Sequence, residues 1–352
     1  MKSKSLVFIV LAIAVCAAAV FMLISEQDKT QDPQKLFPDI AADPVNVIGR
    51  LNELRFEQGE QTLSIQKSDE DIWQVTEKGD FPADVTMIRS LLRALSEAEK
   101  IEEMSSRPED FPKLGVADAD AEEGAGILVE ISDADRSWQL VVGNTAPHLD
   151  QGQYIRLPDE NRNWMINRRL DLDIEIDKWL DKYIIHIPPE DLHRIVIERH
   201  DGETVSTMNL VRLIKGGDFK LENLPEDRKM KSDYLIQQIA AAVDYLQFKE
   251  VFPKDDSFLL PDMHINATFT TFDGLQLGMQ SYQLDDESYA TVTVAFDDDI
   301  ASQYDTLAET RAEIQSDNEY LSQLYANWYY KLLSPTYDSL DMELDDLTTE
   351  KE

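Results

Sequence analysis

The strongest constraint on the fold is an order of elements that occurs twice along the chain. From about residue 51, alternating apolar residues predict two strands and a third strand bearing an aromatic residue, followed by a proline and a helix. From about residue 192 the same order begins again, about 140 residues later. Each copy continues into further strands and closes on a tryptophan-bearing segment, Asp177-Lys178-Trp179-Leu180 or Ala326-Asn327-Trp328-Tyr329, which we expect to be helical. The sequence therefore predicts an α+β fold of two related sheet-plus-helix copies, an internal duplication.

The turns and helices of the two copies support this prediction. Gln58-Gly59, Asp201-Gly202 and Asp273-Gly274 lie between alternating apolar segments and indicate hairpins. Hairpins favour antiparallel or mixed sheets over parallel βαβ units. The helices are predicted from apolar residues at helical spacing. These residues are Val85, Ile88, Leu91, Leu92 and Leu95 in the first copy and Leu235, Ile239, Val243 and Leu246 in the second, with Asp84 and Ser232 as candidate N-caps.

An uncharged apolar segment, residues 6–24, precedes both copies. Its length is close to the roughly 20 residues that a helix needs to cross a bilayer. Lys2 and Lys4 lie before it and acidic residues follow it, which places the N-terminus in the cytoplasm and the remainder outside. We interpret residues 1–25 as an uncleaved transmembrane anchor of the inner membrane. A cleaved signal peptide and lipidation of Cys16 are the alternatives.

The rest of the chain divides by composition. Residues 26–45 are polar and contain several prolines, which is typical of a linker. Residues 46–182 form the first copy and 183–335 the second, and the acidic tail 336–352 is expected to fray. Residues 301–333 indicate one amphipathic helix that includes Trp328-Tyr329-Tyr330. Such a helix either closes the core or docks a partner.

The net charge of −36 excludes one class of function. A nucleic-acid-binding protein needs a basic surface to displace phosphate counterions, and this chain would repel phosphates. The acidity provides solubility, or it forms a face for a basic partner or divalent cations. The single cysteine, Cys16, lies in the apolar segment, so the outer region has no disulfide or thiolate chemistry.

No catalytic motif stands out in the sequence. A nucleophile elbow, a phosphate-binding loop and a dinucleotide fingerprint are all missing from it. His186, His193 and His200 are spaced by seven, but Pro188-Pro189 interrupts any helix between them. The acidic runs 171–177, 285–287 and 297–299 lack the calcium-loop pattern. We interpret these runs as solvated turns, with weak cation sites and a catalytic carboxylate pair as alternatives. We therefore predict no catalytic, cofactor or metal residue, and no enzyme.

Several short motifs resemble the DUF4340 family. They are Trp73-Gln74-Val75, Phe81-Pro82-Ala83-Asp84, Pro108-Glu109-Asp110-Phe111, Leu114-Gly115-Val116, Leu140-Val141-Val142-Gly143, Tyr154-Ile155-Arg156 and Asp177-Lys178-Trp179-Leu180. The resemblance covers most of residues 45–330 and is clearest in 50–200. The second copy departs from it, with Phe219 in place of the tryptophan and no Pro-Ala-Asp. Members of this family of unknown function usually carry an N-terminal membrane helix, and some resemble or accompany auxiliary components of gliding-motility-type ABC transport systems.

The resemblance implies a non-enzymatic periplasmic accessory or scaffold subunit of an ABC-type transport complex. Its partner would be an ABC-type permease or another envelope protein, with residues 6–24 embedded in the membrane. Two alternatives remain open. One is a carboxylate-dependent hydrolase of the cell envelope, which would place one or two acids of raised pKa in a concave pocket. The other is a module that binds a ligand or cation.

Overall fold

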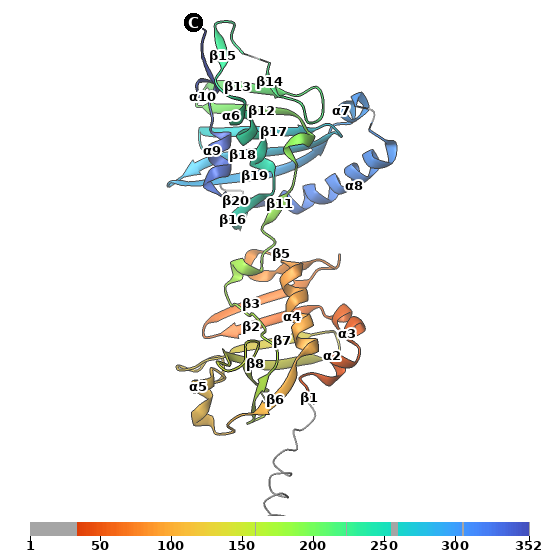
Figure 1. Cartoon of the computed structure of the whole chain (residues 1–352), viewed down its shortest axis with the longest axis vertical. Coiled ribbons are helices and arrows are strands. Elements are labelled where there is room, and N and C mark those ends of the chain that lie inside the picture. The colour runs from red at the N-terminus through yellow and green to blue at the C-terminus, as the bar shows by residue number, and fades with distance from the viewer. Residues whose placement is uncertain (1–33, 159, 223, 255–259, 305, 352) are drawn as a thin grey trace, which may run out of the picture. The chain divides into compact units, whose positions relative to one another are not determined.

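The computed structural model describes residues 34–158, 160–222, 224–254, 260–304 and 306–351 (Figure 1). The chain separates into two compact units. Of the described residues, the first unit contains 34–74 and 85–175, and the second contains 75–84 and 176–351. The expected anchor, residues 6–24, lies outside the described residues. Within the described ranges, no helix is both long and apolar enough to cross a membrane.

A ten-stranded sheet contains the strands of the first unit, in the order β1-β6-β10-β9-β8-β7-β2-β3-β4-β5, and its last strand comes from residues 75–84. The strands are β1 (Gln34–Lys35), β2 (Glu53–Gln58), β3 (Gln61–Lys67), β4 (Trp73–Val75), β5 (Phe81–Pro82), β6 (Glu99–Glu103), β7 (Ile127–Ser132), β8 (Ser137–Thr145), β9 (Gln153–Arg156) and β10 (Asn163–Ile166). The α-helices are α2 (Pro38–Ala42), α3 (Pro44–Arg50), α4 (Val85–Glu97) and α5 (Phe111–Leu114).

A nine-stranded sheet forms the second unit's scaffold, in the order β11-β16-β20-β19-β18-β17-β12-β13-β14. The strands are β11 (Tyr183–Ile185), β12 (Leu192–Asp201), β13 (Thr204–Val211), β14 (Lys220–Leu221), β16 (Leu246–Pro253), β17 (Met263–Thr271), β18 (Leu275–Leu284), β19 (Glu287–Phe296) and β20 (Trp328–Leu332). A separate pair joins β15 (Arg228–Met230) to β21 (Thr348–Glu350). The α-helices are α6 (Asp233–Ala240), α7 (Asp298–Gln303), α8 (Ala308–Tyr325), α9 (Ser334–Leu340) and α10 (Leu344–Leu347).

The two strand orders correspond position by position. Adding ten to each label of the first nine strands in the first sheet, so that β1 becomes β11 and β6 becomes β16, gives the strand order of the second sheet. In the first sheet β10 lies between β6 and β9, and in the second β20 lies between β16 and β19. The match therefore includes a strand that is inserted out of sequence order. The described pairings are antiparallel, which the hairpin turns predict. The predicted α+β class is confirmed, with two large sheets.

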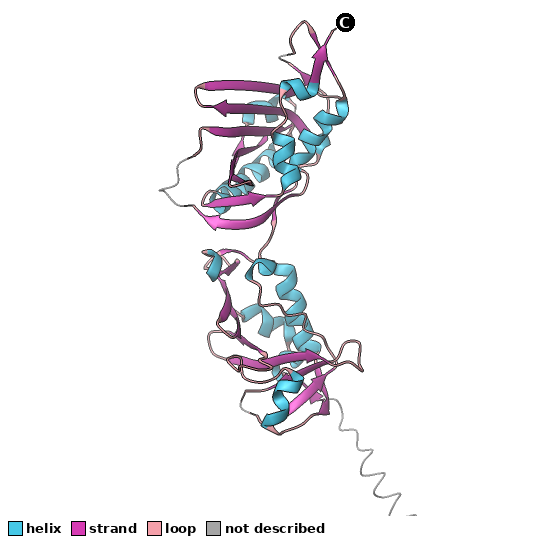
Figure 2. Ribbon diagram, turned by 90° about the vertical axis from the view of Figure 1, so that its left-hand side faces the viewer, coloured by secondary structure: helices cyan, strands magenta, loops and turns pink. Residues whose placement is uncertain are grey.

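Each sheet has an inner face that carries the core. Alternation along β2 and β7 directs Leu54, Phe56, Val129 and Ile131 to the same face, where each is at most 1 % exposed. Helix α4 contributes four buried apolar residues at helical spacing, Ile88, Leu91, Leu92 and Leu95. Most helices of each unit lie along one side of its strands (Figure 2). The opposite face is called the outer face below.

A segment that we call the flap, residues 108–126, covers part of the first sheet's outer face. It contains α5, and it connects β6 to β7. Phe111, Val116 and Ala117 of the flap form a small apolar cluster with Val141 on β8. The guanidinium of Arg156, on β9, donates to the carbonyl of Val116 at 2.9 Å. The flap is therefore an integral layer of the first unit.

The predicted linker 26–45 is wrong from residue 34 onward. This stretch forms β1 and α2 and begins α3, and Leu36, Phe37 and Ile40 are buried. Prolines at the first turns of α2 and α3 start these helices, because proline's fixed φ suits that position. A composition typical of a linker here encodes short helices that pack on the sheet.

The predicted helix over residues 301–333 is also wrong in part. The structure has α7, then α8 ending at Tyr325, and then strand β20. Trp328, Tyr330 and Leu332 are buried while Tyr329 and Lys331 are half-buried, which is the period of a strand. The tryptophan segment of the second copy is therefore a strand, whereas residues 176–179 form the expected helical turn.

Two further predictions need correction. The second helix ends at Ala240 rather than near Leu246, and Tyr245, at a φ of 53°, turns the chain into β16. Ser232 caps this helix as predicted, accepting from the amide of Tyr234 at 3.2 Å. The acidic tail does not fray at 334–350: it forms α9, α10 and β21, and Leu347 is fully buried.

Candidate functional site

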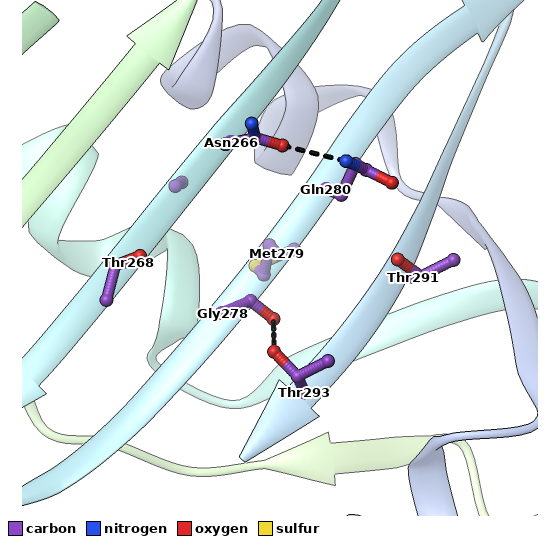
Figure 3. A pocket seen from close by; sticks show the side chains of 8 residues that line it. Asn266, Thr268, Gly278, Met279, Gln280, Thr291 and Thr293 are labelled. Carbon is purple, nitrogen blue, oxygen red and sulfur yellow. Dashed lines mark hydrogen bonds between the residues drawn. The ribbon is translucent and has the colours of Figure 1, made fainter. Parts of the chain in front are cut away.

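A hollow of about 290 Å³ lies on the outer face of the second sheet (Figure 3). Strands β17, β18 and β19 line it side by side. Its lining residues are Asn266, Ala267, Thr268, Gly278, Met279, Gln280, Thr291 and Thr293. Because side chains alternate along a strand, Ala267 and Met279 face the core while the polar residues point outward.

The strand register arranges the polar residues in two rows across the sheet. Asn266, Gln280 and Thr291 are direct neighbours in one row. Thr268, Gly278 and Thr293 form the next. Each row thus places three outward residues on three adjacent strands.

Hydrogen bonds order the amide side chains of the hollow. The amide of Gln280 donates to Oδ1 of Asn266 at 3.1 Å. Nδ2 of Asn266 lies 3.1 Å from Nε2 of His200 on β12, so this ring nitrogen accepts the bond. The ring of His200 stacks on that of His264, with centroids 4.3 Å apart. The network fixes which amide atoms face the hollow.

Gly278 lies on the floor of the hollow and contributes no side chain to it. A Cβ built at this position would lie 2.4 Å from Oγ1 of Thr293. The backbone of Gly278 does not adopt a left-handed φ, so turn geometry does not require glycine here. The absence of a side chain at 278 instead leaves room for the hydroxyl of Thr293, which donates to the carbonyl of Gly278 at 3.5 Å.

Aromatic side chains stand at one end of the hollow. Tyr282 and Tyr289 are cross-strand neighbours next to the Gln280–Thr291 pair, and their rings stack with centroids 5.8 Å apart. Phe252 of β16 lies 6.4 Å from the ring of Tyr289. Burial raises the pKa of Tyr282, so its phenol stays neutral across the physiological range.

The lining of the hollow is polar and uncharged. None of the eight described lining residues is titratable, whereas 29% of the whole chain is charged. Amides and hydroxyls both donate and accept hydrogen bonds, and they match neutral polar groups such as peptide bonds. General acid–base catalysis needs a group that exchanges a proton near neutral pH, and the lining offers none.

The histidines singled out in the sequence do not converge on one site. His193 is buried, and its Nδ1 lies 2.7 Å from the carbonyl of Arg212. His186 is exposed, stacks on Tyr245 and pairs with Asp244 at 3.1 Å. His200 alone of the spaced set joins the network of the hollow. Among the described residues, no group of three or more His, Cys, Asp or Glu is placed to hold a metal ion.

The acidic runs serve as caps, turns and ion pairs. Asp297 caps α7 by accepting from the amide of Ile300 at 3.0 Å. Asp285 and Asp286 form the β18–β19 turn, both at positive φ. Glu287 pairs with Lys331 at 2.8 Å, which lowers the pKa of that carboxyl. These positions agree with the interpretation of the runs as turns.

Asp181 is a carboxyl of the kind that a hydrolase would need. Partial burial raises the pKa of Asp181, and the negative charge of Asp84 adds to the effect. The residue remains exposed to solvent, however, and it does not line the hollow. An exposed carboxyl of this kind is a weak candidate for a general acid.

The family comparison accounts for the short motifs. The model of the domain of unknown function DUF4340 matches residues 73–259, slightly more than half of the chain. The chain belongs to the DUF4340 family. In this DUF4340 protein, the matched region starts at β4 of the first sheet and includes β16 of the second. Strands β17–β19, which line the hollow, lie outside it. No curated protein and no solved structure matches the chain.

Sequence reasoning did not find the hollow, because outward polar residues on a strand are ordinary. The one weak signal is Gly278 itself, a glycine in the middle of a strand. Glycine weakens a strand interior and often marks a place where another group approaches the backbone closely.

Proposed function

We propose that this DUF4340 protein is a membrane-tethered, non-enzymatic binding protein of the cell envelope. Residues 6–24 anchor it in the inner membrane, with the N-terminus in the cytoplasm and the two units in the periplasm. Its partner is an ABC-type transport complex, for which it acts as an accessory or scaffold subunit. The outer face of the second sheet is the recognition surface.

The observation that carries this proposal is the contrast between the two outer faces. The flap covers the first sheet's outer face around Val141, while the outer face of the second sheet has an open hollow with an uncharged lining. An open face on a corresponding framework is suited to a partner, and its lining supports hydrogen bonding without proton transfer. The family resemblance supplies the expectation of a transport complex.

We further propose that the two units arose by duplication of one sheet-plus-helix element. The position-by-position match of the strand orders supports this origin. After duplication, one copy retained or acquired a flap while the other acquired a polar outer face. Such divergence separates a structural role in the first unit from a binding role in the second.

In-cell crosslinking of the tagged full-length protein, followed by mass spectrometry of what co-purifies, tests the proposal. Recovery of an ABC permease or ATPase from the membrane fraction is the expected result. Recovery of the protein alone, or of cell-wall fragments alone, contradicts it. An empty-tag strain, crosslinked and solubilised in the same way, controls for abundant membrane proteins.

A further inference from the structure

We infer that a proton on His200 reverses the hydrogen-bonding polarity of the hollow, acting through a chain of two side-chain amides. The chain runs from His200 on β12 through Asn266 on β17 to Gln280 on β18. Each link joins adjacent strands on the outer face of the second sheet. This inference rests on the proposed function, because it describes how the recognition surface is regulated.

In the structure the amide chain has one direction. Nδ2 of Asn266 donates to Nε2 of His200 at 3.1 Å, and Nε2 of Gln280 donates to Oδ1 of Asn266 at 3.1 Å. Because an amide nitrogen only donates, Nε2 of His200 carries no proton in this state. Oε1 of Gln280 points away from Asn266, on the side of Thr291 (Figure 3). The hollow therefore presents a hydrogen-bond acceptor at Gln280.

A proton on Nε2 of His200 is incompatible with this direction. Both nitrogens of an imidazolium donate, so Nε2 of His200 would face the Nδ2 donor of Asn266. Rotating the Asn266 amide by half a turn places its Oδ1 against His200 and its Nδ2 against Gln280. The amide of Gln280 then rotates as well, so that its Oε1 accepts from Asn266 and its Nε2 takes the outward position.

The rotated chain is a second stable arrangement of the same side chains. It keeps both hydrogen bonds, and the bond from the imidazolium of His200 to Asn266 is charge-assisted and therefore stronger than a neutral one. The outward atom of Gln280 is now a donor instead of an acceptor. A partner group that donates to Gln280 in the unprotonated state would meet a second donor in the protonated state.

His264 is the closest titratable neighbour of His200. The two rings stack with centroids 4.3 Å apart and an angle of 8° between their planes. Nδ1 of His264 lies 3.0 Å from the carbonyl oxygen of Pro261, which only accepts, so this nitrogen donates in either charge state. Two positive rings at this separation repel each other, so the first proton charges one ring of the pair and opposes the second.

Negatively charged side chains surround the stacked rings. Glu198 lies on the same face as His200, two residues earlier on β12. Asp201 and Glu203 follow at the β12–β13 hairpin, and Asp262 precedes the start of β17. Their charge favours the imidazolium form of a nearby histidine.

The other described neighbours of His200 add no positive charge to this face. Val205, its cross-strand partner on β13, does not titrate. Arg199 alternates to the opposite face and pairs with Asp341. Burial raises the pKa of Tyr282 on β18, so its phenol stays neutral. The proton is therefore exchanged at the stacked rings.

Nuclear magnetic resonance of the full-length protein in detergent micelles tests the inference. Asparagine and glutamine are isotope-labelled, and the side-chain amide signals of Asn266 and Gln280 are followed between about pH 5 and pH 8, where histidine changes charge. Asn266→Ser and Gln280→Ser assign the two signals by their disappearance.

Three histidine variants are compared with the natural protein. His200→Gln removes the proton but keeps an oxygen that accepts from Asn266. His264→Gln removes the stacked ring. His148→Gln is the matched control, because His148 is exposed and belongs to the first unit.

The expected result is one joint transition of both amide signals with pH, retained in His264→Gln and His148→Gln and lost in His200→Gln. Signals that stay constant, that move equally in His200→Gln, or that lose their transition only in His264→Gln would overturn the inference. A transition of Asn266 without Gln280 would also overturn it, because the hollow would keep its polarity. The measurement needs no partner, so its failure leaves the proposed function standing, and failure to recover a partner by crosslinking leaves this inference standing.

Discussion

At the scale of single residues, Phe81 has a role that its sequence position does not suggest. It lies within the first copy, yet its ring packs in the second unit, 5.1 Å from Trp328 and 5.3 Å from Phe248. Only 3 % of the residue is exposed. Replacing Phe81 by alanine should leave a cavity and destabilise the second unit by about 3–5 kcal/mol. Hydrogen exchange of the full-length protein should show faster exchange in β16 and β20.

Phe252→Ala is the matched control for Phe81→Ala. Phe252 lies on the same unit, is 37% exposed and contacts Tyr289 on the outer face. Truncating it should cost about 1 kcal/mol, because a partly exposed ring leaves no enclosed cavity. Equal protection losses in the two variants would mean that Phe81 is not a core residue of the second unit.

Asp110 makes the stability of the flap depend on pH. The residue is 8 % exposed, and its carboxylate accepts from Lys113 at 2.6 Å and from Ser105 at 2.7 Å. The bond from Lys113, with those from Ser105 and Arg107, lowers the pKa of Asp110. A lowered folded-state pKa stabilises the fold above the ordinary Asp value of about 3.9, and that stabilisation is lost as pH falls through the folded-state pKa.

The expected outcome is that the flap loosens in acid. Measured by proteolysis with an acid-active protease between pH 7 and pH 2, cleavage within residues 108–126 should increase as the pH falls below about 4. Asp110→Asn should cleave faster at neutral pH and show a smaller change with pH. A variant as pH-dependent as the natural protein would show that other carboxylates dominate the transition.

At the scale of elements, helices and strands were predicted correctly where the apolar residues of a long segment keep a single spacing, either helical or alternating. Strands β12, β17 and β19 alternate over much of their length, and α4 has apolar residues at helical spacing. The predictions failed where a short strand follows a helix. Tyr325 closes α8 and Trp328 opens β20, so the aromatic residues continue while the period changes from 3.6 to 2. Local sequence does not reveal that change, because the neighbours of β20 come from distant parts of the chain.

The site escaped prediction for a related reason. Thr268, Gly278 and Thr293 meet only through the pairing of three strands, and separately each reads as an outward polar or small residue. Gly278 is the distinctive residue of the three, but its place between Thr268 and Thr293 becomes known only from the strand pairing.

The C-terminal elements form part of the second unit rather than a tail. Leu347 is fully buried, and its carbonyl accepts from the amide of Lys231 at 2.8 Å. Leu347→Ala should cost about 2–5 kcal/mol and expose β15 to exchange. Leu344→Ala, at a half-buried position three residues earlier, should cost roughly 1 kcal/mol or less. Chemical denaturation of the two variants side by side measures the difference, and equal midpoints would mean that the C-terminus contributes no core.

At the scale of the whole molecule, we propose that a membrane anchor carries two sheets of matching order, the second of which has an open face. Deleting residues 1–25 should move the protein from the membrane fraction to the soluble fraction, because the apolar segment 6–24 is the proposed tether. Quantitative blotting of fractionated cells checks this. A truncated protein that stays in the membrane pellet after a high-salt wash would require another means of attachment.

The central claim is tested most directly by measuring how much partner co-purifies when a side chain is added at Gly278 on the floor of the hollow. The control is Gly49→Ala, where a Cβ meets nothing within 4 Å. Full-length protein, Gly278→Val and Gly49→Ala are purified in mild detergent at equal amounts, after thermal melts establish that all three are folded, and co-purifying proteins are quantified. We predict that Gly278→Val loses about nine-tenths of the bound partner while Gly49→Ala retains it. Equal recovery from all three would contradict the assignment of the second sheet's outer face as the binding surface.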